Sequence, residues 1–426
     1  MNQSVRLAVF LLICKVICAE TQIISFDASV LTIFIDETIA VGYNLSKENI
    51  ENEDYIIYSE NESVAKVEND TRNGTKGIFE LTGIFLGKTS IYCENVRTKE
   101  NISSSLEVTV IRKEKIIDTL FIASVATLVS LSYINFGCAM DWAELKNILK
   151  NPIGPAIGFF GQFIMMPLLT YGLGLVLFPS NPAMQLGMFF TGCSPGGGAS
   201  NLWTLLLGGN IDLSIVMSAV STIAAFAMMP LWIFTLGRTI FESGNLEVPY
   251  TQIMSYVVGL LVPLGVGYLI QRYLRRVSNF LVRAMKVFST VLLVFIVVFA
   301  IVANFWLFKL FSYEIIIAGM AVPWIGYLIG FSISKLLRRT GPDCTAISIE
   351  IGIQNTGIAI FLLRFTLPQP EADLTTVVPV SIAILTPFPL LFLLICNKIR
   401  ERCWKAETQL EDKNSPTGST VSTLKL

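Results

Sequence analysis

The chain has 426 residues, of which 53% are hydrophobic and 15% are charged, whereas a typical soluble domain carries about 25% charged residues. Its net charge of −1 offers no basic surface for nucleic acid, and its lack of histidine excludes histidine-ligated metal sites and histidine-dependent catalysis. The eight cysteines form no CxxC pair, so neither a zinc module nor a disulfide framework is indicated. This composition predicts a membrane protein that is not an enzyme.

Residues 1–19 are typical of a secretory signal peptide. Arg6 precedes the apolar residues 7–13, and Ala19 ends a small-residue cleavage motif. Lys15 interrupts the apolar stretch, which leaves an uncleaved first span as the alternative. About 13 apolar residues is short against the roughly 20 that a span needs, so cleavage is the preferred interpretation.

Residues 20–115 are predicted to form a small exported β domain. Segments such as 30–36, 78–85 and 106–111 alternate β-branched and polar residues, which favours six or seven strands in an immunoglobulin-like sandwich. Cys93 is the one cysteine of this segment. It is interpreted as a buried thiol, with an interchain disulfide as the alternative.

Glycosylation acceptors of the form Asn-x-Ser/Thr occur in this segment and nowhere after residue 115. Chance acceptors would scatter, whereas acceptors on exported loops collect in one region. The segment is therefore predicted to be extracellular or luminal and glycosylated. The acceptors are Asn44, Asn61, Asn69, Asn73 and Asn101.

Residues 116–400 are predicted to form nine membrane spans. Lysine and arginine gather after the first, fifth, seventh and ninth segments, and positive charge stays on the cytoplasmic side. The first span therefore enters from outside and the polar tail, residues 401–426, is cytoplasmic and disordered. A plasma membrane is favoured over an internal one. The predicted spans are centred on residues 117–136, 153–177, 183–207, 213–236, 250–271, 287–308, 314–334, 344–365 and 374–397.

Two of these spans, the third and the eighth, contain polar, glycine-bearing interruptions at residues 192–201 and 350–357. An offset of five spans places them in opposite orientations, which is typical of inverted-topology repeats, and broken spans at equivalent positions indicate a central binding site. The first repeat would lack its opening helix, and a retained signal segment would supply it.

The side chains at the two interruptions favour a cation site. Glu350 is the carboxylate placed near the middle of a predicted span, where an ionised group is costly unless it is compensated. Ser200, Asn201 and Gln354 add hydroxyl and amide oxygens, and such hard ligands suit Na⁺. The alternative for the Pro195 and glycine string is close helix packing, because small residues let membrane helices approach.

Four strings in these spans resemble the sodium/bile acid cotransporter family: 193-CSPGGGASN-201, 209-GNIDLSIVMS-218, 221-STIAAFAMMP-230 and 350-EIGIQN-355. The resemblance covers about residues 116–400, and the glycosylated exported domain is similar to an orphan branch of that family. It implies an all-α multi-pass fold of nine spans in inverted repeats, with a core domain, a panel domain and two broken helices that cross in the core. A small exported β-sandwich-like domain would precede these spans.

The resemblance also implies specific sites. The first sodium site would consist of Ser200, Asn201, Ser214, Ser218 and Glu350. The second would consist of Gln162, Glu350, Gln354 and the backbone carbonyls of Ile351 and Ile353. The substrate cavity would be formed at Asn355, Gly197 and Gly198, and Gly198 stands where a larger polar residue is common.

The expected function is sodium-coupled symport of an amphipathic organic anion, of the bile acid or sulfated steroid class, by alternating access. Na⁺ is the coupling ion, the lipid bilayer and the organic anion are the partners, no catalytic residue or metal other than sodium is expected, and homodimerisation stays open. The alternative is a transport-inactive, receptor-like or structural membrane protein whose exported domain binds a partner.

Overall fold

The structure is a computed structural model that describes residues 24–45, 55–97, 99, 101, 103–113, 116–139, 152–284 and 312–414. It consists of two compact units, residues 1–120 with 367–374 and residues 121–366 with 375–426. The predicted signal peptide, the predicted sixth span and the last part of the tail lie outside the described residues.

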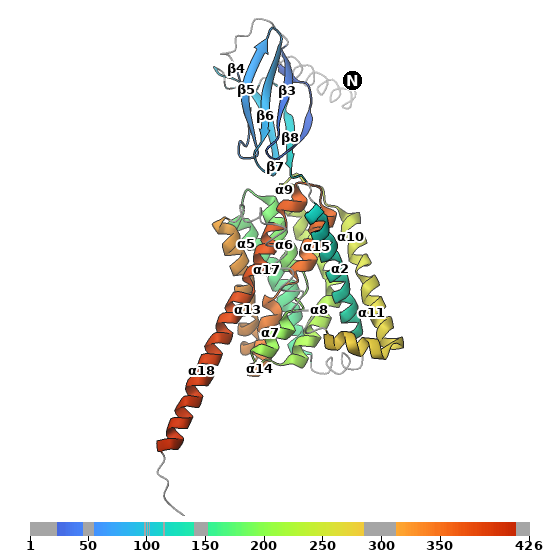
Figure 1. Ribbon diagram of the computed structural model, residues 1–426, viewed down its shortest axis with the longest axis vertical. Helices are drawn as coiled ribbons and strands as arrows, with labels where there is room; N and C mark the ends of the chain where they lie inside the picture. The colour runs from blue at the N-terminus through green and yellow to red at the C-terminus, as the bar shows by residue number, and fades with distance from the viewer. Residues whose placement is uncertain are drawn as a thin grey trace, which may run out of the picture. The chain divides into compact units, whose positions relative to one another are not determined.

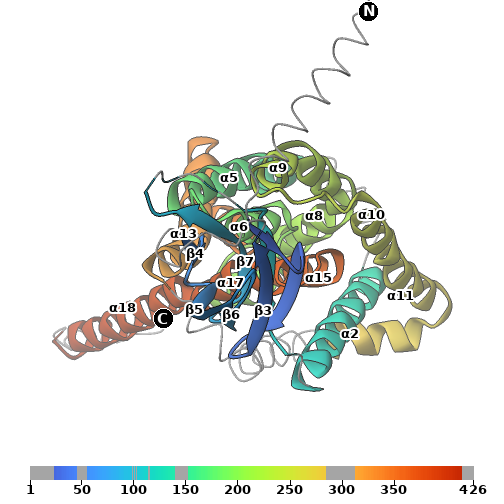
Figure 2. The ribbon, with the colours of Figure 1, turned by 90° about the horizontal axis from the view of Figure 1, so that it is seen from above.

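Unit 1 is built on two four-stranded sheets, with strand orders β1-β3-β6-β5 and β2-β8-β7-β4 (Figure 1, Figure 2). Strands β2 and β8 pair in parallel, and the other pairs are antiparallel. The predicted N-terminal β domain is therefore present, with eight described strands where six or seven were expected. The strands are β1 Ile24–Phe26, β2 Val30–Phe34, β3 Thr38–Leu45, β4 Tyr55–Ser59, β5 Ala65–Asn73, β6 Lys76–Gly83, β7 Gly87–Asn95 and β8 Leu106–Ile111.

The core of unit 1 consists of the inward-facing residues of these alternating strands. Phe79, Leu81, Ile91 and Val108 are almost completely buried, since successive side chains of a strand point to opposite faces. Cys93 belongs to the same core, and burial raises the pKa of its thiol to about 12. This environment supports a buried thiol and disfavours an interchain disulfide.

Unit 1 also contains residues 367–374, with the short helix α16 Glu371–Leu374. Glu371 Oε1 lies 2.7 Å from Lys88 Nζ, and Asp373 Oδ2 lies 3.5 Å from Arg112 Nε. Both carboxylates are buried, and buried carboxylates are normally found with a charged partner. These ion pairs connect the segment to strand β7 and to the residue that directly follows β8 in the same unit.

Unit 2 is helical, and within its described residues five helical stretches are long and apolar enough to cross a membrane by length and composition. They are Ile153–Leu177, Ile211–Ser243, Tyr250–Tyr273, Tyr313–Leu336 and Glu371–Arg400, the last of which starts with unit 1 residues. Ala123–Ala139 and Thr356–Thr366 are shorter apolar helices. The multi-pass helical class is consistent with the prediction, and the count of nine spans is not established by the described residues.

Besides α16, the described helical segments include two π-helical ones, η2 and η3. Their bounds are α2 Ile116–Ala139, α4 Ile153–Phe160, η2 Gly161–Met165, α5 Met166–Leu177, α6 Pro182–Cys193, α7 Ser200–Leu206, α8 Ile211–Trp232, η3 Ile233–Gly237, α9 Arg238–Ser243, α10 Tyr250–Gly259, α11 Leu261–Tyr273, α13 Tyr313–Leu336, α14 Gly341–Gly352, α15 Thr356–Thr366, α17 Val377–Leu385 and α18 Pro387–Asn414.

Helices α2 and α11 of unit 2 pack through small residues. A Cβ added at Gly137 would overlap the carbonyl oxygen of Leu264, and one added at Gly267 would overlap the carbonyl oxygen of Ile134. Cys138 Sγ also donates to the carbonyl oxygen of Gly267 at 3.4 Å. Glycine lets two membrane helices approach at backbone distance, and here it fixes α2 as one wall of a cavity described below.

The tail differs from its prediction. Helix α18 continues to Asn414, so residues 401–414 are helical where the polar composition predicts disorder. The physical reason is that Glu, Lys, Ala, Gln and Leu are good helix formers. No proline or glycine interrupts residues 391–414.

Candidate functional site

The two sequence interruptions are true helix breaks, and they meet. Helix α6 ends at Cys193 and α7 begins at Ser200, while α14 ends at Gly352 and α15 begins at Thr356. The backbone amide of Gly197 donates to the carbonyl oxygen of Ile353 at 2.8 Å. This bond satisfies backbone groups that the missing helical turns leave free, as an apolar interior requires.

A second backbone hydrogen bond joins the two breaks. The backbone amide of Asn355 donates to the carbonyl oxygen of Pro195 at 3.0 Å. Together the bonds form an antiparallel bridge between Gly196 and Gln354. The crossing of the two broken helices is thus a short piece of two-stranded sheet inside a helical unit.

Glu350 lies on α14 directly before this crossing and is 2% exposed. Ser200 of α7 donates to its Oε2 at 2.7 Å, and Ser218 of α8 donates to Oε1 at 2.9 Å and Oε2 at 3.0 Å. A buried carboxylate without partners would strongly destabilise the fold. Two hydroxyl groups from separate helices therefore stabilise it.

The other members of the first predicted sodium site belong to the same polar network. Ser214 Oγ donates to Asn201 Oδ1 at 2.8 Å, and the hydroxyls of Ser200 and Ser218 lie 3.3 Å apart. Thr204 Oγ1 donates to Ser214 Oγ at 3.3 Å and is fully buried. Sequence reasoning missed Thr204, although it follows Ser200 by one helical turn, where side chains share a face.

The second predicted site gathers around Gln162, which lies in the π-helical segment η2. Its Nε2 donates to Gln354 Oε1 and to the carbonyl oxygen of Ser194, both at 2.6 Å, and Gln354 Nε2 donates to the carbonyl oxygen of Ile351 at 2.7 Å. The carbonyl oxygen of Ile353 accepts the crossing bond from Gly197. Single π-helical turns often occur at functional sites.

The oxygen atoms at the crossing fit a hard cation. Gln162 Oε1 is buried and has no hydrogen-bond partner among the described residues, and an unpaired buried acceptor is unfavourable. In this structure Ser200 and Ser218 donate to Glu350. A hydroxyl group can rotate, and its oxygen carries two lone pairs that can bind a cation. The same groups can therefore turn oxygen toward a cation.

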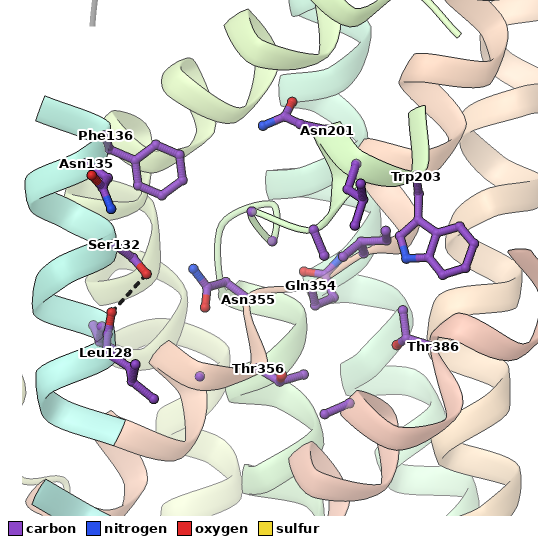
Figure 3. A pocket seen from close by; sticks show the side chains of 18 of the residues that line it. Leu128, Ser132, Asn135, Phe136, Asn201, Trp203, Gln354, Asn355, Thr356 and Thr386 are labelled. Atoms are coloured by element: carbon purple, nitrogen blue, oxygen red, sulfur yellow. Dashed lines mark hydrogen bonds between the residues drawn. The ribbon is translucent and has the colours of Figure 1, made fainter. Parts of the chain in front are cut away.

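A cavity of about 290 Å³ adjoins the crossing (Figure 3). Asn355, Gly197 and Gly198, which were predicted to form a substrate cavity, line it. Among the described residues that line it, none carries a charge. Sequence reasoning missed the α2 wall, formed by Ser132, Asn135, Phe136 and their apolar neighbours; an amide within the apolar stretch of residues 133–139 is a signal that could have identified it.

Residues 126–309 match the family model described as Sodium Bile acid symporter family. This chain contains a sodium bile acid symporter family domain. The match includes the α6–α7 break and ends before the break that carries Glu350. The description of the model names a family of symporters.

Several curated proteins are similar to this chain. Human P3 protein is 32% identical over 257 residues, which are 60% of this chain and 54% of that protein. Mouse sodium-dependent organic anion transporter is 32% identical over 248 residues, which are 58% of this chain and 65% of that protein. Mouse sodium/bile acid cotransporter 5 is 28% identical over 287 residues, which are 67% of this chain and 66% of that protein.

The alignment spans about half the length of the P3 proteins. Among solved structures, a crystal structure of domains 4 and 5 of the S-layer protein SbsC is similar to part of this chain. The match covers 20% of this chain and 44% of the SbsC chain, at 14% sequence identity and with a TM-score of 0.17. Such a likeness says nothing about the fold.

Proposed function

We propose that the protein is a sodium-coupled symporter of an amphipathic organic anion, of the bile acid or sulfated steroid class. The observation that carries this proposal is the buried carboxylate of Glu350, bonded by Ser200 and Ser218 at a crossing of two broken helices. Relatives named as sodium/bile acid cotransporters and a sodium-dependent organic anion transporter support the choice of ion and anion.

Two sodium ions would bind at the crossing. The first would take Glu350, Ser200 and Ser218, with Asn201 and Ser214 completing the set. The second would take oxygen from Gln162 and Gln354, from Glu350, and from the backbone at Ile351 and Ile353. Hard oxygen ligands of this kind suit Na⁺.

Sodium would prepare the anion site by compensating the charge of Glu350. A carboxylate close to the cavity repels an anion, and this repulsion is stronger in an interior of low polarity than in water. One bound sodium ion would neutralise the local charge and two would reverse its sign, and the N-terminal end of α15, beside Asn355, adds a favourable dipole. Binding of the cation and the anion would therefore be mutually favourable.

Transport would follow from alternating access around this fixed site. We infer nine spans in inverted repeats, with the crossing helices in a core domain that moves against a panel domain. The β domain would be extracellular or luminal after removal of residues 1–19, and the C-terminus cytoplasmic, in a plasma membrane. Two sodium ions with one monovalent anion move one net charge, worth about 2.3 kcal/mol per 100 mV.

Uptake of labelled bile acids and sulfated steroids into proteoliposomes tests this function. We expect uptake to require an inward sodium gradient and to be lost in Glu350→Gln, because a neutral amide removes the charge that holds both ions. Glu242→Gln is the matched control, since Glu242 forms an exposed pair with Arg238. Uptake that ignores both sodium and Glu350→Gln contradicts the proposal.

A receptor-like role is the second candidate, and the separate hydrophobic core of the β domain is the observation that favours it. A domain with its own core can present a binding surface without help from the helices. Thermal stability of the purified protein in sodium and in potassium discriminates the two functions. Equal stability in both salts, with capture of a protein by the β domain, supports the receptor-like role.

A further inference from the structure

A short helix of unit 2, residues 275–284, directly follows α11 and is called the basic helix below. Leu274 separates the two helices, and its φ of −122° and ψ of 56° break the helical path. In Figure 1 the gold ribbon after α11 turns sideways at this point. Because α11 completes the apolar stretch Tyr250–Tyr273, the basic helix begins at the end of a candidate membrane span.

One side of the basic helix packs on the rest of unit 2. Ser278 is 3% exposed, and its Oγ donates to the carbonyl oxygen of Cys138, near the end of α2, at 3.2 Å. Val282 follows Ser278 by four residues and so lies on the same side, where it lines the cavity beside the crossing. These contacts fix the rotation of the helix about its axis, and therefore the directions of its other side chains.

A second side of the basic helix is positively charged. Arg275, Arg276 and Arg283 are exposed, and none of them forms an ion pair with another described residue. Asn279 is also exposed, and its spacing of three or four residues from each arginine places the four side chains on one side. Residues 248–313 contain no Asp or Glu. The charge of this side is therefore available to an external partner.

A third side of the basic helix is apolar and exposed. Val277 is 44% exposed and Phe280 is 69% exposed, and a spacing of three residues places them together. A helix with arginine on one side and large apolar residues on another is typical of the membrane interface, where the apolar side enters the border of the acyl chains. Both exposed sides therefore fit the boundary between acyl chains and head groups.

We propose that the basic helix is a binding site for anionic phospholipids. Arg275, Arg276 and Arg283 contact the phosphate and other anionic groups of the lipid head, and Phe280 lies among the acyl chains. A guanidinium group can donate two parallel hydrogen bonds to one phosphate. A phospholipid supplies both the anionic group and the apolar chains that the two exposed sides require, whereas a free phosphate or an acidic protein supplies only the charge.

Basic residues also determine the orientation of a membrane span, but that role depends on their number in a loop. It does not require that charged and apolar side chains occupy separate sides of a helix. Under the proposed topology the basic helix is cytoplasmic, and the cytoplasmic leaflet contains the anionic lipids. The inference adds a lipid site to the proposed function and does not depend on sodium coupling.

Equilibrium binding of fluorescent lipids to the purified full-length protein in a neutral detergent tests this site. The probes are phosphatidylserine and phosphatidylcholine with the same labelled chains. We expect a Kd about tenfold lower for phosphatidylserine in about 0.1 M KCl. The difference should fall below about threefold in about 0.5 M KCl, because salt screens exposed charges. Arg276→Gln combined with Arg283→Gln should remove the preference.

The matched control is Lys335→Gln combined with Arg338→Gln, at the end of α13. It removes the same charge from exposed residues outside the basic helix, so it should keep the preference. The unfolding temperature without added lipid checks that each variant is folded, and none of the four substitutions touches Ser278. The salt dependence of the unaltered protein tests the role of charge even where a variant does not fold.

Equal affinity for the two lipids, a preference that salt does not change, or an equal loss in both double variants overturns the lipid site. Two soluble competitors test the choice of partner. Displacement of the labelled lipid by an equal concentration of glycerophosphoserine, or of an octaglutamate peptide, overturns the phospholipid in favour of a free phosphate or an acidic protein. Selective lipid binding by a protein without sodium-dependent uptake supports this inference and overturns only the proposed function.

Discussion

At the scale of single residues, Gly196 of the crossing lies directly against Glu350. A Cβ added at Gly196 would overlap Glu350 Oε1 and would lie 3.3 Å from Ser221 Oγ. The backbone amide of Gly196 also donates to Ser221 Oγ at 3.3 Å. The absence of a side chain at this position is therefore a steric requirement of the carboxylate.

We predict that Gly196→Ala weakens sodium binding by about tenfold, or about 1.4 kcal/mol, because the methyl group displaces either the carboxylate or the bridge. The sodium concentration that gives half of the thermal stabilisation measures this effect. Gly172→Ala on α5 is the control, since an added Cβ there meets nothing within 4 Å. Equal sodium dependence in both variants would show that Glu350 does not hold the ion.

At the scale of elements, the N-terminal ends of α8 and α14 are joined. Asn210 Oδ1 accepts from the backbone amide of Leu213 and so caps α8, while Thr340 caps α14 by accepting from the amide of Asp343. Asn210 Nδ2 donates to Asp343 Oδ1 at 2.8 Å. The capping group of α8 therefore also bonds the first turn of α14, which joins the two helices that supply Ser218 and Glu350.

Asp343 is also paired with Arg339, whose Nη2 lies 2.8 Å from Asp343 Oδ2. We predict that Asp343→Asn lowers the free energy of unfolding by about 1–3 kcal/mol, because the buried amide retains the bond from Asn210 but loses the charged one. Thermal unfolding of the purified protein measures the change.

The control for this experiment is Glu242→Gln, which breaks the exposed Arg238–Glu242 pair. Exposed ion pairs contribute little to stability, so its unfolding temperature should stay close to that of the unaltered protein. Equal unfolding temperatures for the two variants would mean that the capping cluster does not stabilise the helices.

At the scale of the whole molecule, the side of the membrane on which the β domain lies can be tested through its glycosylation acceptors. The side chains of Asn61, Asn69, Asn73 and Asn101 are exposed, and that of Asn44 is partly buried. We predict that the protein made in eukaryotic cells carries N-linked glycans and that an N-glycosidase lowers its apparent mass. A variant with glutamine at all five positions should show no such change.

This outcome depends on orientation, since the glycosylating machinery acts on exported segments of secreted and membrane proteins. A mass that the glycosidase does not alter would contradict the exported location of the β domain. It would leave the proposed sodium site untouched, because every residue of that site belongs to unit 2.

Periodicity and composition were sufficient for much of the architecture. Alternating β-branched residues predicted the β domain, and the five long apolar helices coincide with predicted spans. The strand number differed because short segments such as Ile24–Phe26 are too brief to give a period. The tail was wrong over residues 401–414, since polarity alone does not distinguish disorder from an exposed helix.

By itself, the sequence determined the class of the protein, the positions of the two breaks and the identity of the polar residues beside them, because each depends on local composition and on order along the chain. Only the tertiary structure decided which of these residues meet. The bonds of Glu350 to Ser200 and Ser218, the bridge between Gly196 and Gln354, and the place of Asn135 on the cavity wall join residues that are distant in sequence. Such contacts depend on the packing of helices, which no local pattern encodes.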